Sequence, residues 1–222
     1  KRLIPVHEMY ANPKVTQKLI DDAIINVEAW LAGKVGDKFA RTEATAFISG
    51  DGVGKPTGIL TNTTTSTSYD PDSVQVVNSG TQGAFTYAGL VSMQNALKEP
   101  YQANAYFLMK RSSFGSVMQI KTGISGDNRP IFNMMYDKNT GLATSILSKP
   151  VMFADDVPAV ANDVNAAIYG DFRAGYTIVD RIGMRILRDP YSSKPYVQFY
   201  CTKRVGGDVV NAEALKILAL SN

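Results

Sequence analysis

Apolar and polar residues alternate through the last third of the chain, and this alternation predicts two long β-strands. The apolar residues that share one face of the first strand are Tyr176, Ile178, Ile182, Met184 and Ile186. Thr177, Arg181 and Arg185 occupy the opposite face, because successive side chains of a strand point to opposite sides. After Asp189-Pro190 the chain returns through a proline-rich turn, and a second alternating strand carries Val197, Phe199, Cys201 and Val205. We call this predicted strand pair the ribbon.

A different period earlier in the chain predicts a long helix. The apolar residues that recur every four positions are Val27, Leu31, Val35 and Phe39. They share one face of a helix that runs from Val27 to about Ile48, with Asn26 as its N-cap. At ~1.5 Å per residue this spine helix would be about 33 Å long. Asn12-Pro13 similarly predicts the start of a short helix that ends near Asp22.

The middle of the chain has a mixed α/β pattern. Thr86 and Ser112 are the predicted N-caps of two helices. The predicted strands are Ala105–Met109, Val151–Ala154 and Ala166–Tyr169. Thr61–Ser68 indicates a surface loop, and Lys121–Thr144 has turn signals with little periodicity. Asn211–Leu220 fits a helix or a strand equally well.

Composition is that of an ordinary globular protein, with 222 residues, 45% hydrophobic and 19% charged. This length can bury a substantial core. The net charge of +3 is too small to indicate nucleic-acid binding. No apolar run of about 18 residues predicts a membrane span. Because the chain opens at Lys1 without a methionine or a signal peptide, we expect a processed or trimmed product of a larger protein.

No group of residues predicts catalysis, a cofactor or a metal site. Gly50–Thr57 resembles a phosphate-binding loop, but Ser49 stands where the first glycine is needed, and Pro56 follows the lysine where Ser or Thr would bind magnesium. A glycine turn that ends the spine helix is the simpler interpretation. His7 and Cys201 are the single residues of their kinds, too few for a catalytic triad or a zinc site. We expect the cysteine to be a small buried residue.

Six basic residues follow the ribbon: Arg181, Arg185, Arg188, Lys194, Lys203 and Arg204. They could form an interface between subunits, a solvated surface or a nucleic-acid surface. Asp180, Asp189 and Asp208 are interleaved with them and lower the net positive field. This mixture favours an interface held by salt bridges over nucleic-acid binding.

Several segments, in order along nearly the whole chain, resemble the major capsid proteins of tailed bacteriophages. In the first quarter they are Asn12–Ala23, Val27–Leu31, Phe39–Glu43, Ala46-Phe47 and Gly50–Gly52. In the last third they are Gly170–Phe172, Tyr176–Arg181, Arg188–Tyr191 and Lys203–Gly207. The resemblance implies the α+β fold of these capsids, also called Hong Kong ninety-seven-like, which herpesvirus capsid floors and encapsulins share.

In that fold a peripheral domain carries the spine helix and the long β-ribbon, and a mixed α/β axial domain surrounds the ring centre. The resemblance places the peripheral domain at residues 1–69 and 175–205 and the axial domain at 70–174 and 206–222, which makes Asn211–Leu220 a strand. The family's N-terminal arm and extended hairpin loop are expected to be absent from this chain. Ser193–Tyr196, between the ribbon strands, contains no Asn, so isopeptide crosslinking is not expected.

The function implied by the resemblance is a structural subunit, without enzyme activity, of an icosahedral phage or prophage capsid shell. Such subunits self-assemble into pentamers and hexamers that enclose DNA. The implied partners are copies of the chain, a portal, a scaffold or maturation protease, and non-specific packaged DNA on the inner face, with no membrane. The implied location is the virion capsid, assembled in the bacterial host cytoplasm.

Aromatic residues and arginines are typical of interfaces, so we expect seven residues at contacts between subunits. They are Trp30, Arg181, Arg188, Asp189, Tyr191, Lys194 and Arg204. Three alternatives stay open: an encapsulin-like nanocompartment shell, a nucleotide-dependent enzyme that uses Gly50–Gly58, and a monomeric binding module.

Overall fold

The structure is a computed structural model that describes residues 3–66, 70–121, 136–137, 141–142 and 145–222. The chain divides into two compact units. Unit 1 comprises Lys1–Gly58 and Ile178–Asp208, and unit 2 comprises Ile59–Thr177 and Val209–Asn222. Each unit is therefore built from segments that are far apart in the sequence.

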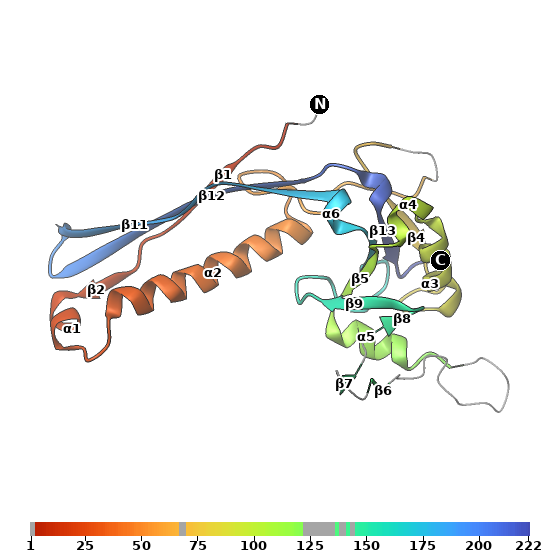
Figure 1. Ribbon diagram of the computed structural model, residues 1–222, viewed down its shortest axis with the longest axis horizontal. Coiled ribbons are helices and arrows are strands. Elements are labelled where there is room, and N and C mark those ends of the chain that lie inside the picture. Colours follow the sequence, from red (N-terminus) through yellow and green to blue (C-terminus); the bar gives the residue numbers. More distant parts are fainter. Residues whose placement is uncertain (1–2, 67–69, 122–135, 138–140, 143–144) are drawn as a thin grey trace. The chain divides into compact units, whose positions relative to one another are not determined.

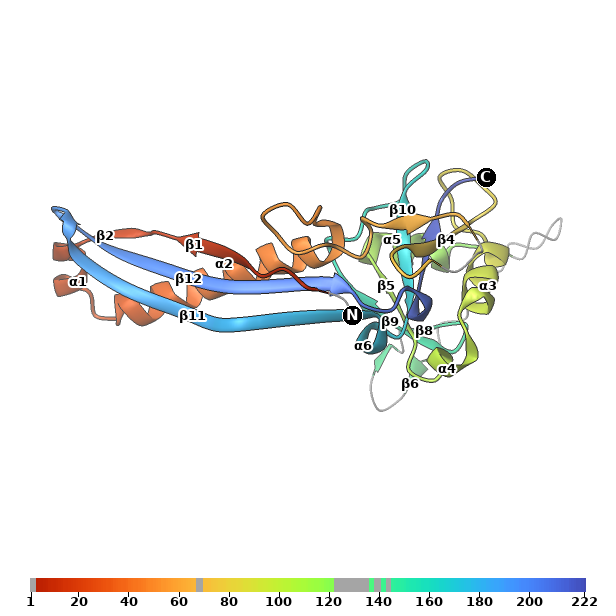
Figure 2. The ribbon, with the colours of Figure 1, turned by 90° about the horizontal axis from the view of Figure 1, so that it is seen from above.

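Unit 1 contains a four-stranded sheet centred on β12. Its strands are β1 (His7–Ala11), β2 (Lys14–Thr16), β11 (Tyr176–Ser193) and β12 (Tyr196–Val209). β1 pairs antiparallel with the second half of β12, from His7 opposite Val205 to Ala11 opposite Cys201, and β2 pairs with its start. β11 lies on the other side of β12, so the ribbon is present (Figures 1 and 2). Among the described residues, no strand pairs with the outer edge of β11.

The ribbon turns between Ser193 and Tyr196, as the sequence predicts, and the chain does not return directly after Asp189-Pro190. β11 continues through Asp189 and Pro190 to Ser193, and the chain reverses at Lys194-Pro195. Proline removes a backbone donor, and an edge strand can place that position toward solvent without losing a bond to its neighbour. The strand therefore runs past Pro190 instead of ending there.

The spine helix is confirmed as α2 (Val27–Ser49), which lies along the ribbon (Figure 1). The Asn26 side chain caps it, because Oδ1 accepts a hydrogen bond from the backbone N–H of Ala29 at 3.0 Å. Val35 and Phe39 pack against the inner face of β12. The β12 residues in this core are Val197, Phe199 and Cys201. The cysteine is buried as expected, and burial raises the pKa of its thiol.

The prediction of a helix that starts at Asn12-Pro13 is wrong. Strand β2 follows Pro13, and helix α1 begins only at Gln17 and ends at Asp22. The N-cap is Thr16, whose hydroxyl accepts from the backbone N–H of Leu19 at 3.3 Å. Pairing of β2 with β12 keeps this stretch extended, so tertiary pairing overrides the local capping signal.

Unit 2 contains a seven-stranded mixed sheet in the order β3-β4-β13-β10-β5-β9-β8. Its strands are β3 (Thr63–Thr64), β4 (Val74–Asn78), β5 (Tyr106–Met109), β8 (Ser145–Ile146), β9 (Lys149–Phe153), β10 (Asn165–Gly170) and β13 (Leu215–Ala219). The helices are α3 (Tyr87–Ala96), α4 (Glu99–Gln102), α5 (Arg111–Met118), α6 (Phe172–Gly175) and the short 3-10 helix η1 (Ala212–Ala214). A separate two-stranded pair consists of β6 (Tyr136–Asp137) and β7 (Gly141–Leu142).

Both faces of this sheet are covered. One core contains Leu90 and Met93 of α3 together with Phe107 and Tyr169 of the sheet. The other core lies on the opposite face of the sheet and contains the residues that alternate with the first set along the strands, such as Ile168 and Ile217. The central strand β13 is buried at every position. This explains why Asn211–Leu220 shows no alternation, because a strand covered on both faces carries apolar residues throughout.

Other predictions for unit 2 have mixed outcomes. Thr86 caps α3 as predicted, and its hydroxyl accepts from the N–H of Gly89 at 2.9 Å. Ser112 is not an N-cap, because α5 already begins at Arg111 and has no side-chain cap. Most of Lys121–Thr144 lies outside the described residues, as do the last two residues of Thr61–Ser68.

Gly170 explains one of the segments singled out in the sequence. Its φ is +151°, and a Cβ at this position would lie 2.0 Å from the carbonyl oxygen of Ala214. Asp171 follows it as the N-cap of α6, and its Oδ1 accepts from the backbone N–H groups of Arg173 and Ala174 at 3.0 and 3.2 Å. The glycine permits the close approach, and the aspartate then starts the helix.

Candidate intersubunit surface

Several exposed apolar side chains belong to α1, the start of α2 and the ribbon turn, which all lie at one end of unit 1 (Figure 1). We call this set the tip surface: Leu19, Ile24, Ile25, Trp30, Leu187, Tyr191 and Tyr196. Trp30 is 53% exposed, Leu187 is 62% exposed and Tyr191 is 81% exposed. A group of large apolar residues left in water marks a contact site.

The tip surface is assembled by contacts between α1, α2 and the ribbon turn. The backbone N–H of Gln17 donates to the carbonyl of Pro195 at 3.4 Å, and Thr16 lies opposite Tyr196 in the sheet. The Lys14 ammonium donates to the hydroxyl of Ser193 at 3.4 Å. These bonds hold the start of α1 beside the turn.

Arg188 connects the ribbon to the start of the spine helix. Its Nε lies 3.1 Å from Oε1 of Glu28. Glu28 is in the first turn of α2, which also carries Trp30. Both charged side chains are about half exposed, so water screens the pair, and it contributes only about 0–1 kcal/mol to folding. The arginine therefore keeps free donors that a neighbouring chain could use.

Asp189 organises the strand end that presents Tyr191. Its Oδ1 accepts from the backbone N–H groups of Tyr191 and Ser192 at 2.8 and 3.2 Å, and Oδ2 accepts from the Ser192 hydroxyl. The Ser192 hydroxyl, followed by the backbone donors, lowers the pKa of the Asp189 carboxyl. The Asp189 side chain therefore bonds only residues of its own strand in these contacts, and it fixes the backbone at Tyr191 and Ser192.

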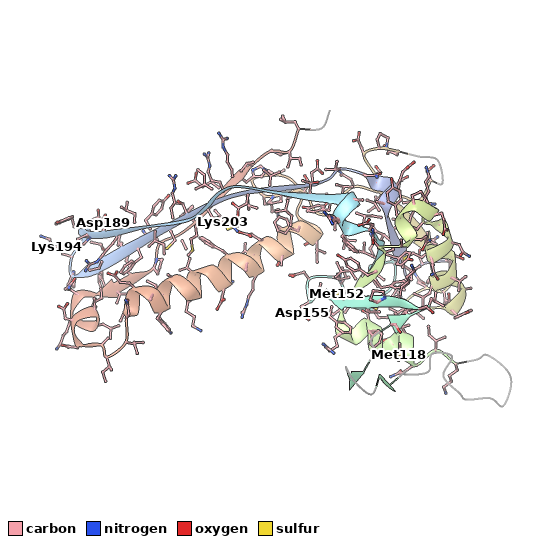
Figure 3. All side chains as sticks on the ribbon, in the orientation of Figure 1. Met118, Met152, Asp155, Asp189, Lys194 and Lys203 are labelled. Carbon is pink, nitrogen blue, oxygen red and sulfur yellow. The ribbon has the colours of Figure 1, made fainter. Side chains whose placement is uncertain are left out.

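The structure brings five of the seven predicted residues to this end: Trp30, Arg188, Asp189, Tyr191 and Lys194. Figure 3 shows Asp189 and Lys194 where the ribbon turns. Arg181 and Arg204 lie farther along the ribbon. Arg204 contacts Glu8 of β1 through a 3.4 Å ion pair, and Arg181 is exposed with no ion pair to any described residue.

Lys203, which the sequence groups with the surface cations, lies instead between the ribbon and α2. Its Nζ is 2.7 Å and 2.8 Å from the two carboxylate oxygens of Glu43 and 3.5 Å from Asp180. Burial opposes the charge, but the carboxylates of Glu43 and Asp180 outweigh it and raise the pKa of the Lys203 ammonium. This cluster is internal and holds the ribbon on the spine helix.

Sequence reasoning missed most apolar members of the tip surface. Ile24 and Ile25 fall between two helices, where no periodicity assigns them to a face. The apolar face of β11 is also less covered than its alternation suggests, because Ile178, Met184 and Ile186 are exposed in this edge strand. An apolar pair in a polar interhelical segment is the signal that could have found the first two.

The glycine loop, Gly50–Gly58, has the geometry of a helix end. A Cβ at Gly50 would lie 2.1 Å from the carbonyl oxygen of Pro56, so only glycine fits this close turn. Lys55 forms an ion pair with Asp51 at 3.3 Å, and the backbone N–H of Val53 also donates to that carboxylate. These two interactions lower the pKa of Asp51, with the Val53 bond the larger cause. The loop follows the negative end of the α2 dipole, which disfavours a phosphate.

Metal-binding and membrane features were sought in the described part of the chain. Within it, no three His, Cys, Asp or Glu side chains gather in a way that could hold a metal ion. None of the helices described is both long enough and apolar enough to cross a membrane.

Comparison with known proteins gives consistent matches. The profile described as "Phage capsid family" matches residues 1–220. The capsid of the empty GTA particle, in C5 symmetry, is 42% identical with a TM-score of 0.89, and the alignment covers 99% of this chain and 74% of that chain. The capsid of the native GTA particle is 41% identical with a TM-score of 0.88 and the same coverage.

A more distant match shares the fold alone. The SrpI encapsulin from Synechococcus elongatus PCC 7942 is 14% identical with a TM-score of 0.70, and the alignment covers 98% of this chain and 74% of that chain. No curated protein matched the sequence. The α+β fold with a spine helix and a ribbon, predicted from the resemblance, is thus confirmed.

Proposed function

Since this chain belongs to the phage capsid family and is a subunit of a capsid shell, we propose that the tip surface is a contact between subunits of that shell. The observation that carries the proposal is the exposure of Trp30, Leu187 and Tyr191 together at one end of unit 1. Burying a side chain of this size contributes about 1.5–3 kcal/mol. Contacts of this strength, repeated around a closed symmetric shell, are sufficient for assembly.

Unit 1 takes the peripheral place and unit 2 the axial place in the proposed arrangement, which consists of pentamers and hexamers. Support comes from the location of the spine helix and ribbon in unit 1 and of the mixed sheet in unit 2. The subunit works without enzymatic turnover. A portal, a scaffold or maturation protease and non-specific packaged DNA on the inner face are its further partners, and assembly takes place in the bacterial host cytoplasm.

An encapsulin-like shell is less well supported. The encapsulin match is at 14% identity and reflects the fold, whereas the GTA capsids match at 41–42%. The nucleotide-dependent enzyme is disfavoured by the glycine loop, where Lys55 is already paired with Asp51.

Charge reversal at Arg188 tests the proposed contact. Because Arg188 pairs with Glu28 in its own chain, the variants needed are Arg188→Glu and the double reversal Arg188→Glu with Glu28→Arg. The double variant restores the internal pair with opposite polarity. If Arg188 contacts a neighbouring chain, both variants fold but neither assembles, as seen by electron microscopy.

Assembly of the double variant at the level of the unmodified protein would assign Arg188 a purely internal role and remove it from the interface. Circular dichroism of both variants verifies that the subunit is folded. The matched control is Arg185→Glu, an exposed arginine of the same strand outside the tip surface, which we expect to assemble.

A further inference from the structure

The outer edge of β11 is open along unit 1, and Figure 2 shows this strand on the outside of the ribbon. Among the described residues, no strand pairs with that edge. Met184, Ile186 and Leu187 are nevertheless exposed there. The segment Asp180–Arg188 contains no proline that would block a further strand. An exposed apolar edge of this kind is a template for pairing with another chain, and native proteins cover or protect it.

The side chains of this segment divide cleanly between the two faces of the sheet. Asp180 lies 3.5 Å from Lys203, and Arg188 lies 3.1 Å from Glu28 of α2. Met184 lines a cavity together with residues of the same helix. Asp180, Met184 and Arg188 therefore share the face that looks toward α2. Because side chains alternate along a strand, Ile182 and Ile186 lie on that face too.

The α2-facing side chains are complementary to themselves when the segment is read in reverse. If two copies pair antiparallel about a two-fold axis at Met184, Asp180 of each copy lies opposite Arg188 of the other. Ile182 then lies opposite Ile186, and Met184 lies opposite its own counterpart. Opposite charges and apolar pairs across two strands are the combinations that stabilise a sheet. The result is an apolar strip closed at both ends by ion pairs.

The side chains of the other face select the same register. Arg185 lies opposite Gly183, where an added Cβ would meet no atom within 4 Å, and Arg181 lies opposite Leu187. The two nearest registers that keep the same faces together are worse. One places Arg181 opposite Arg185, and the other places Arg185 opposite its own counterpart. Like charges directly opposite each other destabilise a sheet, so the register centred on Met184 is favoured.

Asp180 and Arg188 can make these pairs while keeping their contacts within the chain. Both side chains are about half exposed. A guanidinium has five N–H donors and a carboxylate accepts several hydrogen bonds, so one internal partner does not exhaust either group. Across the axis the charges would alternate in sign, from Glu28 and Arg188 of one copy to Asp180, Lys203 and Glu43 of the other.

We propose that the outer edge of β11 pairs with β11 of a second copy, antiparallel and centred on Met184. The two unit 1 sheets then form one continuous sheet across a two-fold axis, and the contact is isologous. A second copy is the occupant because the charges, apolar residues and glycine of this segment are complementary to the same segment. This contact goes beyond the tip surface, with which it shares Leu187.

A disulfide on the two-fold axis tests the contact in shells of the complete protein. Opposite residues of antiparallel strands have Cα atoms about 4.5–5.5 Å apart, within the range of about 4.4–6.8 Å that a disulfide spans. We expect assembled Met184→Cys shells, after mild oxidation, to give a band at twice the subunit mass that reduction removes. The unmodified protein should give none, because Cys201 is buried in the core.

Ile178→Cys is the matched control, an exposed apolar position of the same strand. In the proposed register the two copies of this residue are roughly 40 Å apart at ~3.4 Å per residue, so its shells should stay monomeric on the gel. Ile182→Cys and Ile186→Cys test the register. Each cysteine alone lies roughly 14 Å from its own counterpart, so we expect crosslinks only in shells assembled from a mixture of the two variants.

Assembled Met184→Cys shells without dimers would overturn the inference, and this result is also expected if a different segment covers the edge. Crosslinking of Ile182→Cys or Ile186→Cys alone would overturn the register. If Met184→Cys prevents assembly, the mixture of the other two variants decides: mixed dimers support the pairing, and their absence from assembled shells contradicts it. None of these failures affects the tip surface, because its test is the burial of Trp30 and Tyr191.

Discussion

Replacing Lys203 by methionine tests the internal ion cluster that holds the ribbon on the spine helix. The side chains of Lys203 and Glu43 are 20% and 11% exposed, and their charged atoms are 2.7 Å apart. Removing one partner of a buried pair costs about 3–5 kcal/mol, because the other charge stays buried without compensation. Since both side chains retain some exposure, we expect Lys203→Met to lower the free energy of unfolding by about 3 kcal/mol.

Urea unfolding followed by Trp30 fluorescence measures this effect. Trp30 lies in unit 1, as does the whole cluster, so the probe reports the unit that is perturbed. The partner variant is Glu43→Gln, and the double variant removes both charges. We expect the double variant to be less destabilised than the sum of the single variants by at least about 1.5 kcal/mol.

The pH dependence gives a second measure of the same interaction. The Lys203 pKa is raised above its ordinary value of 10.5, so the folded state holds this proton more tightly than the unfolded state. Its contribution is fully present below about pH 10.5 and is lost as the pH rises through the folded pKa. Lys203→Met should lack this alkaline loss. A cost below about 1 kcal/mol, with additive single variants, would refute the reasoning.

Three further predictions concern local structure. Gly170→Ala should destabilise unit 2 by at least about 3 kcal/mol in thermal unfolding, because its Cβ would meet the Ala214 carbonyl, whereas Gly115→Ala, in an open helix position, should not destabilise. Asn26→Ala should cost about 1 kcal/mol in urea unfolding through the lost α2 cap, and an unchanged midpoint would contradict the capping role. Asp189→Ala should speed amide hydrogen exchange at Tyr191 and Ser192. Because the Asp189 pKa is lowered, the protection in the unmodified chain should be present above about pH 3.8 and lost as the pH falls through the folded pKa. Protection of these two amides that does not change as the pH is lowered would contradict this role of the Asp189 carboxylate.

The elements that sequence predicted well are those whose signals are local. Asn26 and the four-residue period of Val27 to Phe39 are sufficient to place α2 within a residue or two. Thr86 does the same for α3. In both cases the cap and the apolar stripe point to the same boundaries, so tertiary contacts reinforce what the chain prefers locally.

Errors occur where a distant strand decides the local conformation. Asn12-Pro13 carries a capping signal, but pairing of Lys14–Thr16 with β12 imposes a strand. β13 is covered on both faces, so apolar and polar residues do not alternate along it and the sequence pattern does not distinguish a strand from a helix. Pro190 looks like a turn and is an edge-strand residue, because the sheet order could not be known from the sequence.

The candidate site was predicted in part for the same reason. Composition suggested arginines and aromatics of the ribbon, but their place beside the start of α2 depends on α1 and α2 returning to the ribbon turn, where Arg188 pairs with Glu28 and Gln17 bonds Pro195. A cavity between β1 and α2 likewise joins residues separated by more than 190 positions, from His7 to Val205. No spacing rule connects residues so far apart.

A density map of the assembled particle tests the central claim, that this chain works through contacts of its tip surface with other copies. We predict that Trp30 and Tyr191 of the tip surface, together with Arg188, lie buried between neighbouring subunits at every symmetry-related position of the shell. A map in which the tip surface faces solvent in all copies, while other surfaces hold the shell together, would contradict the account.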